Sequence, residues 1–312
     1  MNFSLARTSH APAFETDIGP RPRHEHFVLQ DDAAPAAADT PRRRLRLRPD
    51  LLLAAGFVLL LLAASVHPSW LTHLDPQAAS ARDAFLAPSG AHWLGTDENG
   101  RDVLARLIYG VRASMVLGIA ATVIAVGAGV LLGISAGLGG RAADAALMRF
   151  IDTLLAFPDV LLALVIITFW GQGMTNAIVA IGVASIPRYA RLARAQSRIV
   201  RSSGYVEAAV TLGLRRSTLI WRHVLPNSIK PILLLAAIGI GEKITAGAAL
   251  SFLGFGAPPP APEWGSMLSV GRNYLANAVW LVIAPGAAIT LTVLAITSLG
   301  RELVARSEGV RS

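Results

Sequence analysis

The chain is long, apolar and basic: of its 312 residues, 53% are hydrophobic and 15% are charged, and the formal net charge is +8. This composition is richer in apolar residues than soluble domains usually are, so it indicates an integral membrane protein. The basic residues gather beside the apolar stretches rather than in a stripe interleaved with aromatic residues, which argues against a nucleic-acid partner. The absence of cysteine excludes disulfides and thiolate metal sites.

The apolar stretches predict an all-α membrane protein with about six transmembrane helices. A span needs about 20 mostly apolar residues, because the bilayer core offers no water to bond the backbone polar groups. Residues 1–48 are predicted to be a disordered basic tail, and residues 49–70 the first transmembrane helix. The other five spans are expected within a core at residues 112–306, near residues 113–140, 145–170, 177–187, 229–255 and 273–300.

The connection between the first two spans is predicted to be an external segment at residues 71–111. Within it, Thr96 or Asp97 would cap an interfacial helix running from Glu98 to Tyr109. The segment is net acidic, which suits the outer side of a membrane.

The orientation of the chain follows from its basic residues. From residue 188 to residue 230, nine basic residues stand against one acid. Because basic segments stay preferentially in the cytoplasm, this segment is predicted to be cytoplasmic. An even number of spans then places both termini in the cytoplasm, including a short tail at residues 307–312.

Three charged residues fall inside or at the edge of predicted spans: Asp159, Glu242 and Lys243. Ionisable groups near the middle of a membrane are costly and usually face a cavity or a partner, so we predict that these three line a translocation path. Adjacent helix positions point about 100° apart, so Glu242 and Lys243 are not expected to face one line. A kink in the third span is predicted at Pro158, which lacks a backbone donor.

These residues leave three classes of function open. One is an ATP-driven transporter component, and a second is an ion-gradient-driven secondary transporter or channel that uses Glu242 and Lys243. A third is a scaffold or signalling protein whose arginine-rich loop binds anionic membrane lipid. No phosphate-binding loop, catalytic constellation or metal-ligand spacing occurs, so we expect neither an enzyme nor a bound metal or cofactor.

A polar island interrupts the apolar spans at residues 192–228. Its local signals predict a helix that Ser203 or Gly204 opens, with Glu207 in the first turn, where the helix dipole favours a carboxylate. Gly213 would end this helix, and a second short helix would stop near Pro226. From these signals alone, an ordinary amphipathic surface hairpin explains the segment as well as a docking element does.

This island resembles the EAA loop of ABC importer permeases. The match is carried by Glu207, Ala208, Ala209, Gly213, Leu225 and Pro226, which stand at the family's spacing. Four other stretches resemble the dipeptide, oligopeptide and nickel branch of that family, in its shorter, six-span permease type. They are residues 92–110, 149–158, 250–256 and 258–268. One departure is Gly247, where the family often has a glutamate.

The resemblance implies a permease subunit in the inner membrane of a bacterium that forms half of a translocation path and couples to ATPase subunits through the six residues of the EAA match. Its expected partners are a second related permease, two ABC ATPases that carry ATP and Mg, and an external solute-binding protein. Glu263 and Trp264 are predicted to face that binding protein, although Trp264 also suits the interfacial aromatic belt. The substrate stays open among dipeptides, longer peptides, nickel chelates, glutathione and other small solutes.

Overall fold

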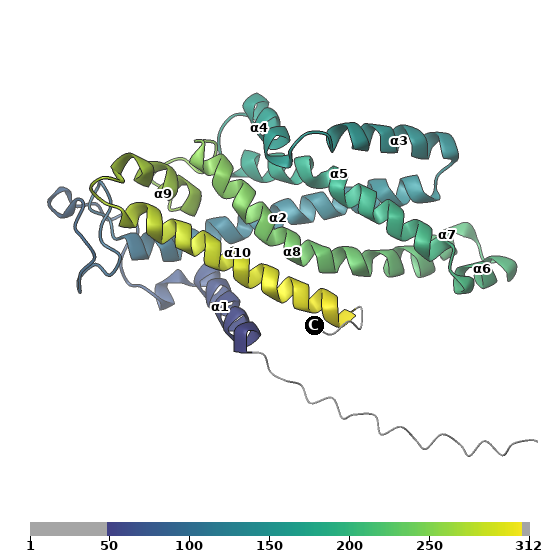
Figure 1. Ribbon diagram of the computed structural model, residues 1–312, viewed down its shortest axis with the longest axis horizontal. Coiled ribbons are helices and arrows are strands. Elements are labelled where there is room, and N and C mark those ends of the chain that lie inside the picture. Colours follow the sequence, from purple (N-terminus) through teal and green to yellow (C-terminus); the bar gives the residue numbers. More distant parts are fainter. Residues whose placement is uncertain (1–48, 308–312) are drawn as a thin grey trace, which may run out of the picture. The chain divides into compact units, whose positions relative to one another are not determined.

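The computed structural model describes residues 49–307, and every regular element in that part of the chain is a helix (Figure 1). The all-α prediction is therefore confirmed for the described residues. The predicted tails at residues 1–48 and 307–312 lie outside them, except for Ser307. The α-helices are α1 Pro49–Val66, α2 Val103–Leu138, α3 Arg141–Leu154, α4 Asp159–Trp170, α5 Met174–Arg201, α6 Gly204–Thr211, α7 Arg216–Leu219, α8 Leu225–Phe252, α9 Trp264–Gly271 and α10 Trp280–Ser307. Short 3₁₀ helices lie at Pro68–Trp70, Ala81–Asp83 and Arg272–Tyr274, and a π-helical turn lies at Ile220–Val224.

Four helical stretches in the described part are long and apolar enough to cross a membrane, and a fifth is obtained if α3 and α4 form one bent span. The four are Pro49–Val66, Val103–Leu138, Ser217–Phe252 and Trp280–Ser307. The chain is thus a multi-span membrane protein, but the expected count of about six is higher than this one. The two counts differ because α5 does not qualify as a span. Its first half is apolar, but its second half contains five arginines, the last of which is Arg201.

The third predicted span is broken rather than merely kinked. Helices α3 and α4 are bent by 90° at the break between them. The first ends at Leu154, and Pro158 lies just before the first residue of the second. Proline has no backbone N–H and disfavours helix at the residue before it, so the break falls where the sequence places it.

Among the described helices, α2 and α5 pack against each other most extensively, and small residues make this close packing possible. A Cβ atom at Gly133 of α2 would lie 2.2 Å from the backbone oxygen of Ala190 in α5. Small residues let helix backbones approach closely in membranes, where burial of apolar surface gives no drive for association. The backbone of α2 is therefore held against α5 along a seam that a larger side chain at Gly133 would open.

The start of α2 corrects the predicted interfacial helix. The helix begins at Val103, not at Glu98, and it runs without interruption to Leu138. Asp102 is the capping residue, because its side chain accepts a hydrogen bond from the Ala105 N–H at 2.7 Å. Asp97 instead closes a tight turn by accepting from two later backbone N–H groups. The Asp97 side chain therefore stabilises a turn before the helix instead of capping the helix.

Candidate functional site

The EAA segment, residues 203–226, contains the short helix that the sequence predicts. Helix α6 begins after Ser203, holds Glu207 in its first turn and ends at Thr211, two residues before Gly213. Gly213 has a φ of +77°, its N–H donates to the oxygen of Val210, and the next N–H donates to the oxygen of Ala209. This pair of bonds is the Schellman arrangement that terminates helices at glycine. The local prediction for α6 is confirmed.

The second half of the EAA segment differs from the prediction. The chain does not stop at Pro226 but passes through a π-helical turn directly into α8, where Pro226 lies in the first turn. In that turn the Leu225 N–H donates to the oxygen of Ile220, five residues earlier. The wider turn accommodates a proline, which lacks an N–H and would clash with the carbonyl four residues before it. The EAA segment from Ser217 onward is therefore continuous with a membrane-spanning helix, whereas α6 is joined to it by the turn at Gly213.

The outer surface of the EAA segment is uncovered and carries several large apolar side chains beside charged ones such as Arg215 and Arg222. Val206 and Ala209 are buried against the rest of the chain, whereas Glu207 and Ala208 are exposed. The large exposed apolar side chains around them are Tyr205, Val210, Leu212, Leu214 and Trp221. Among the residues that the structure describes, none pairs with the Glu207 side chain through an ion pair or a side-chain hydrogen bond. Figure 1 shows α6 and α7 together at the opposite end of α8 from α9.

The three predicted path residues lie together and share a fourth residue that the sequence analysis did not single out. Arg188 of α5 donates to the Glu242 carboxylate of α8 at 2.6 Å and to the Asp159 carboxylate of α4 at 3.0 Å. Lys243 lies 3.5 Å from the same Glu242 oxygen. We call these four residues the charged cluster. In the sequence, Arg188 belongs to the basic segment that was predicted to be cytoplasmic. No local signal indicates that its side chain reaches Glu242 and Asp159.

The charged cluster lines a cavity of about 400 Å³ between α4, α5, α8 and α10. Its remaining lining is largely apolar: Val160, Ala163, Ile181, Ser185, Thr245, Ala246, Ala249, Leu250, Val293 and Thr297. Arg188 and Glu242 are each about half exposed, whereas Lys243 is buried and lies over the ring of Tyr189. The cluster holds two acids and two bases, so the charges at the cavity wall are balanced.

The prediction that Glu263 and Trp264 face another protein is wrong for the positions observed. Trp264 is 1% exposed, and its indole N–H donates to the oxygen of Leu107 at 2.9 Å. The Glu263 carboxylate caps α9 by accepting from the N–H groups of Gly265 and Ser266, both at 2.8 Å. Burial raises the pKa of the Glu263 carboxyl, and the two N–H bonds oppose that effect. Both side chains therefore hold α9 in place.

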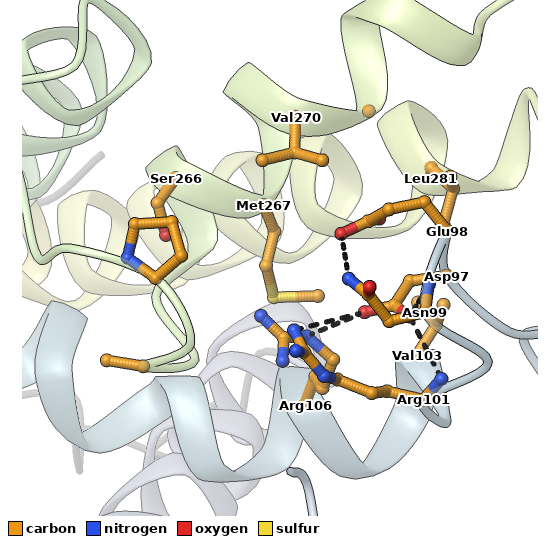
Figure 2. A pocket seen from close by; sticks show the side chains of 13 residues that line it. Asp97, Glu98, Asn99, Arg101, Val103, Arg106, Ser266, Met267, Val270 and Leu281 are labelled. Atoms are coloured by element: carbon orange, nitrogen blue, oxygen red, sulfur yellow. Dashed lines mark hydrogen bonds and ion pairs between the residues drawn. The ribbon is translucent and has the colours of Figure 1, made fainter. Parts of the chain in front are cut away.

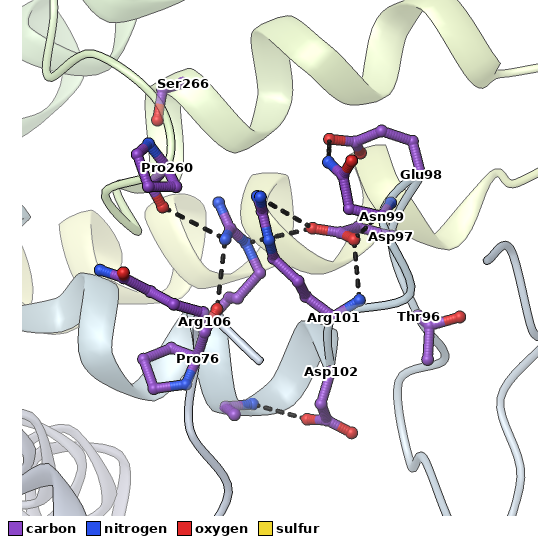
Figure 3. Close-up of polar contacts among 12 residues, drawn as sticks. Pro76, Thr96, Asp97, Glu98, Asn99, Arg101, Asp102, Arg106, Pro260 and Ser266 are labelled. Carbon is purple, nitrogen blue, oxygen red and sulfur yellow. Dashed lines mark hydrogen bonds and ion pairs between the residues drawn. The ribbon is translucent and has the colours of Figure 1, made fainter. Parts of the chain in front are cut away.

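A second group of charged residues lies beside α9, at the opposite end of α8 from α6. There Asp97, Arg101 and Arg106 lie next to the loop that precedes α9 (Figure 3). Arg106 is buried, and it donates to the backbone oxygens of Pro76 and Pro260, both at 3.3 Å. One side chain thus ties three segments that lie far apart in the sequence. Acids and arginines of the stretch at residues 92–110 therefore hold these segments together.

The geometry so far defines a class: an α-helical, multi-span membrane protein with a charged cavity between spans and an uncovered two-helix segment at one end. Residues 129–308 match the model of the family "Binding-protein-dependent transport system inner membrane component". The chain belongs to that family. It is therefore a permease subunit of an ABC importer, which decides between the functional classes that its residues left open.

Named relatives cover most of the chain. It is 41% identical to the glutathione transport system permease protein GsiD of Pectobacterium atrosepticum, over 81% of this chain and 85% of that one. It is 40% identical to the probable D,D-dipeptide transport system permease protein DdpC of Escherichia coli, over the same shares of both chains. It is 38% identical to the dipeptide transport system permease protein DppC of Alkalihalophilus pseudofirmus, over 80% and 81%.

The helix arrangement is similar to that of solved ABC transporters. One is an inward-facing form of the MetNI methionine transporter, with a TM-score of 0.52 and 20% identity over 64% of this chain and 95% of that one. Another is an amino acid ABC transporter, with a TM-score of 0.51 and 17% identity over 65% and 94%. At these identities the likeness concerns the fold alone.

Proposed function

We propose that the EAA segment receives mechanical force from a separate ATPase subunit and passes it into α8. The observation that carries this proposal is the exposed apolar surface around Glu207, on a segment that continues into a membrane-spanning helix. Exposed apolar patches of this kind mark interaction sites. Because Ser217–Phe252 form one continuous helical stretch, a push on the segment around Trp221 moves the helix that carries Glu242, and the turn at Gly213 links α6 to that stretch.

In this proposal the α6 end lies in the cytoplasm, and the α9 end faces outward. The basic residues from Arg191 to Lys230, beyond the Arg188 of the charged cluster, support that orientation. The N-terminus is then also cytoplasmic, and the membrane is the inner membrane of a bacterium, as the family description implies. ATP and Mg are bound by the ATPase subunits, of which we propose two.

The charged cluster is proposed to line the translocation path, of which this chain supplies half and a second, related permease the other half. Half-exposed charges at membrane depth are costly unless they face water or a partner, which is the situation of Arg188 and Glu242. A wall with balanced charges and apolar neighbours suits a small zwitterion, and the named relatives transport glutathione and dipeptides. We therefore propose a small peptide or peptide derivative as the solute, delivered by an external binding protein.

The coupling role is tested by purifying the protein from mildly solubilised native membranes, comparing the parent with Glu207→Arg and identifying the chains that co-purify. The parent is expected to bring an ATPase and a second permease. Glu207→Arg should lose the ATPase and keep the permease, because the substitution places a large cation at the centre of the apolar surface. The matched control is Asp75→Arg, which changes an exposed acid on a segment that does not belong to the EAA segment.

One outcome contradicts the proposal: recovery of the ATPase with Glu207→Arg in the same amount as with the parent, which means that the EAA segment is not the docking element. Loss of both partners from Glu207→Arg would show instead that the substitution damages the fold or the permease interface, and it would not count as support.

A further inference from the structure

We infer that Asp144 is a positioning residue for coupling. It ties the end of α5 to α3, so that α4, one wall of the cavity that the charged cluster lines, follows the movement of the EAA segment. The inference rests on the proposed function, because it adds a second route for the force that α8 is proposed to carry. We call the contact of Asp144 with Arg194 and Arg198 the aspartate clamp.

Helices α3 and α4 set their acids against arginines of α5. All three acids between residues 141 and 170 are paired in this way: Asp144 with Arg194 and Arg198, Asp152 with Arg191, and Asp159 with Arg188. The four arginines are three or four positions apart, so they follow one face of α5. Acids that come later in the sequence meet arginines that come earlier, so α3 runs antiparallel to the second half of α5.

Asp144 is the most buried of these three acids, with a side chain that is 8% exposed. Its two oxygens accept from the Nε and Nη2 atoms of Arg194, the latter at 2.6 Å, and one of them also accepts from Nη2 of Arg198. A two-point contact of this kind fixes the orientation of both partners. Asp152 and Arg191, by contrast, are each more than half exposed, and exposed ion pairs contribute little.

The rest of the contact that α3 makes is small. Its buried residues besides Asp144 are Met148 and Ile151, which pack with Ala136 of α2 and Ala190 of α5. Asp144 lies in the first turn of α3, one turn before Met148. The start of α3 is therefore held to α5 chiefly by the aspartate clamp.

The aspartate clamp lies between the EAA segment and the cavity. Arg198 is in the last turn of α5, which ends at Arg201, and α6 begins three residues later at Gly204. At its other end, α3 leads through residues 155–158 into α4, whose first residue, Asp159, lines the cavity. A movement of α6 that carries the end of α5 with it therefore also moves α3 and the start of α4.

Helix α5 alone is a weaker connection, because Pro187 lies inside it. Proline has no N–H to bond the carbonyl four residues earlier, and helices bend most readily at such points. Helix α4 shares an apolar cluster with the part of α5 before this proline, where Ala163 and Ile167 lie with Ala177 and Ala180. The arginines of the aspartate clamp come after the proline. The clamp thus connects α4 with the EAA segment without passing through Pro187.

The inference is tested with pairs of spin labels on introduced cysteines, because the chain itself has none. One pair is Phe169→Cys on α4 with Leu53→Cys on α1, at positions that are 82% and 75% exposed. The second pair replaces the α4 label by Leu233→Cys on α8, at a 55% exposed position. The whole complex, purified from native membranes into nanodiscs, is measured by double electron–electron resonance without nucleotide and with MgATP and vanadate. The complex without introduced cysteines gives the background.

In the parent, both distances are expected to change when MgATP and vanadate are added. With Asp144→Asn, the change at α4 should fall at least twofold, whereas the change at α8 should persist, because α8 receives the force along the chain. Asp144→Glu should restore the change at α4, because it restores the carboxylate. Should Asp144→Asn fail to assemble, the double variant with Arg194→Gln removes both charges of the two-point contact, and the same result is expected of it.

Two matched controls separate the aspartate clamp from a general loss of stability. Asp97→Asn removes a carboxylate that is also 8% exposed and also faces two arginines, Arg101 and Arg106, but beside α9 (Figure 2). Asp152→Asn removes the exposed ion pair of the same helix α3. Both variants should keep the parental changes at α4 and α8.

The inference is overturned if the change at α4 is parental with Asp144→Asn or with the double variant, or if Asp97→Asn lowers it equally. It is also overturned if the α4 label stays still in the parent while the α8 label moves. None of these results affects the proposed role of the EAA segment and α8. A parental α8 label that stays still contradicts that proposed role, and the inference then fails with it.

Discussion

The two ends of α8 differ in whether the chain itself buries the large side chains around them. At the α9 end, polar and aromatic side chains are buried and bonded to the chain itself: Glu263 caps α9, Trp264 bonds Leu107, and Arg106 ties two loops. At the α6 end, Leu212 is 80% exposed and Trp221 is 69% exposed, with nothing in the described chain covering them. The first end completes its own packing, and the second leaves apolar surface for a partner.

The comparison shows that the sequence position of a tryptophan beside a membrane span does not determine whether its side chain is buried or exposed. Trp264 and Trp221 both stand near proline and basic or acidic neighbours in the sequence, yet the first is buried and the second is exposed. What separates them is the number of segments that meet around each side chain. Four substitutions sharpen or break this contrast, and they follow in order of expected effect.

Trp264→Ala should destabilise the protein by about 3–5 kcal/mol, because it empties a fully buried site and removes the bond to Leu107. The measurement is unfolding in detergent, with tryptophan-independent detection. The matched control is Trp93→Ala, at a 73% exposed position, which should change stability by less than about 1 kcal/mol. Equal effects of the two substitutions would show that the α9 end is not packed around Trp264.

Gly213→Val should lower transport at least tenfold while the protein still inserts. A β-branched residue at a φ of +77° is strained by about 1–2 kcal/mol, so α6 can no longer end at this point. ATP hydrolysis by the complex should continue without transport. The control is Gly204→Val, where a Cβ atom meets nothing within 4 Å and no positive φ occurs. Parental transport by assembled Gly213→Val protein would rule out a mechanical role for this bend.

Gly133→Ala should cost about 1–3 kcal/mol, because the added Cβ would overlap the backbone oxygen of Ala190 and force α2 away from α5. Stability is measured as above. Gly127→Ala lies on the same helix with no atom within 4 Å of the new Cβ, so it should be close to neutral. Comparing these two substitutions tests whether the contact between α2 and α5 is as closely packed as the α9 end.

Glu263→Gln should change how stability depends on pH. Because burial raises the folded-state pKa of Glu263, its contribution to stability is present below the unfolded pKa and is lost as pH rises through the folded pKa. The parent should therefore lose stability relative to Glu263→Gln between acidic and neutral pH. Melting curves at several pH values measure this, with Asp75→Asn as an exposed control. Parallel pH profiles for the parent and Glu263→Gln would contradict it.

Local signals in the sequence predicted local structure well. Helix α6 begins directly after Ser203, although the Ser203 side chain makes no capping bond to it, and the left-handed Gly213 follows its end. The glycine termination is predictable because it involves only residues a few positions apart. The break before α4 follows from Pro158 for the same reason. At Pro226 the local rule was wrong, since a π-helical turn absorbed the proline and carried the helix into α8.

The composition by itself determined an all-helical membrane protein, and the resemblance of the EAA segment to a known family indicated an ABC importer permease, since the composition and the motif are properties of the chain that no packing changes. Tertiary structure alone decided that Arg188 joins Glu242 across 54 positions of sequence, that Glu263 and Trp264 are buried, and that Arg101 and Arg106 share Asp97. Apart from the Arg101–Asp97 pair, which lies four positions apart in one turn, these contacts join residues on separate helices or loops. Their distances depend on how the helices pack, which no local propensity encodes.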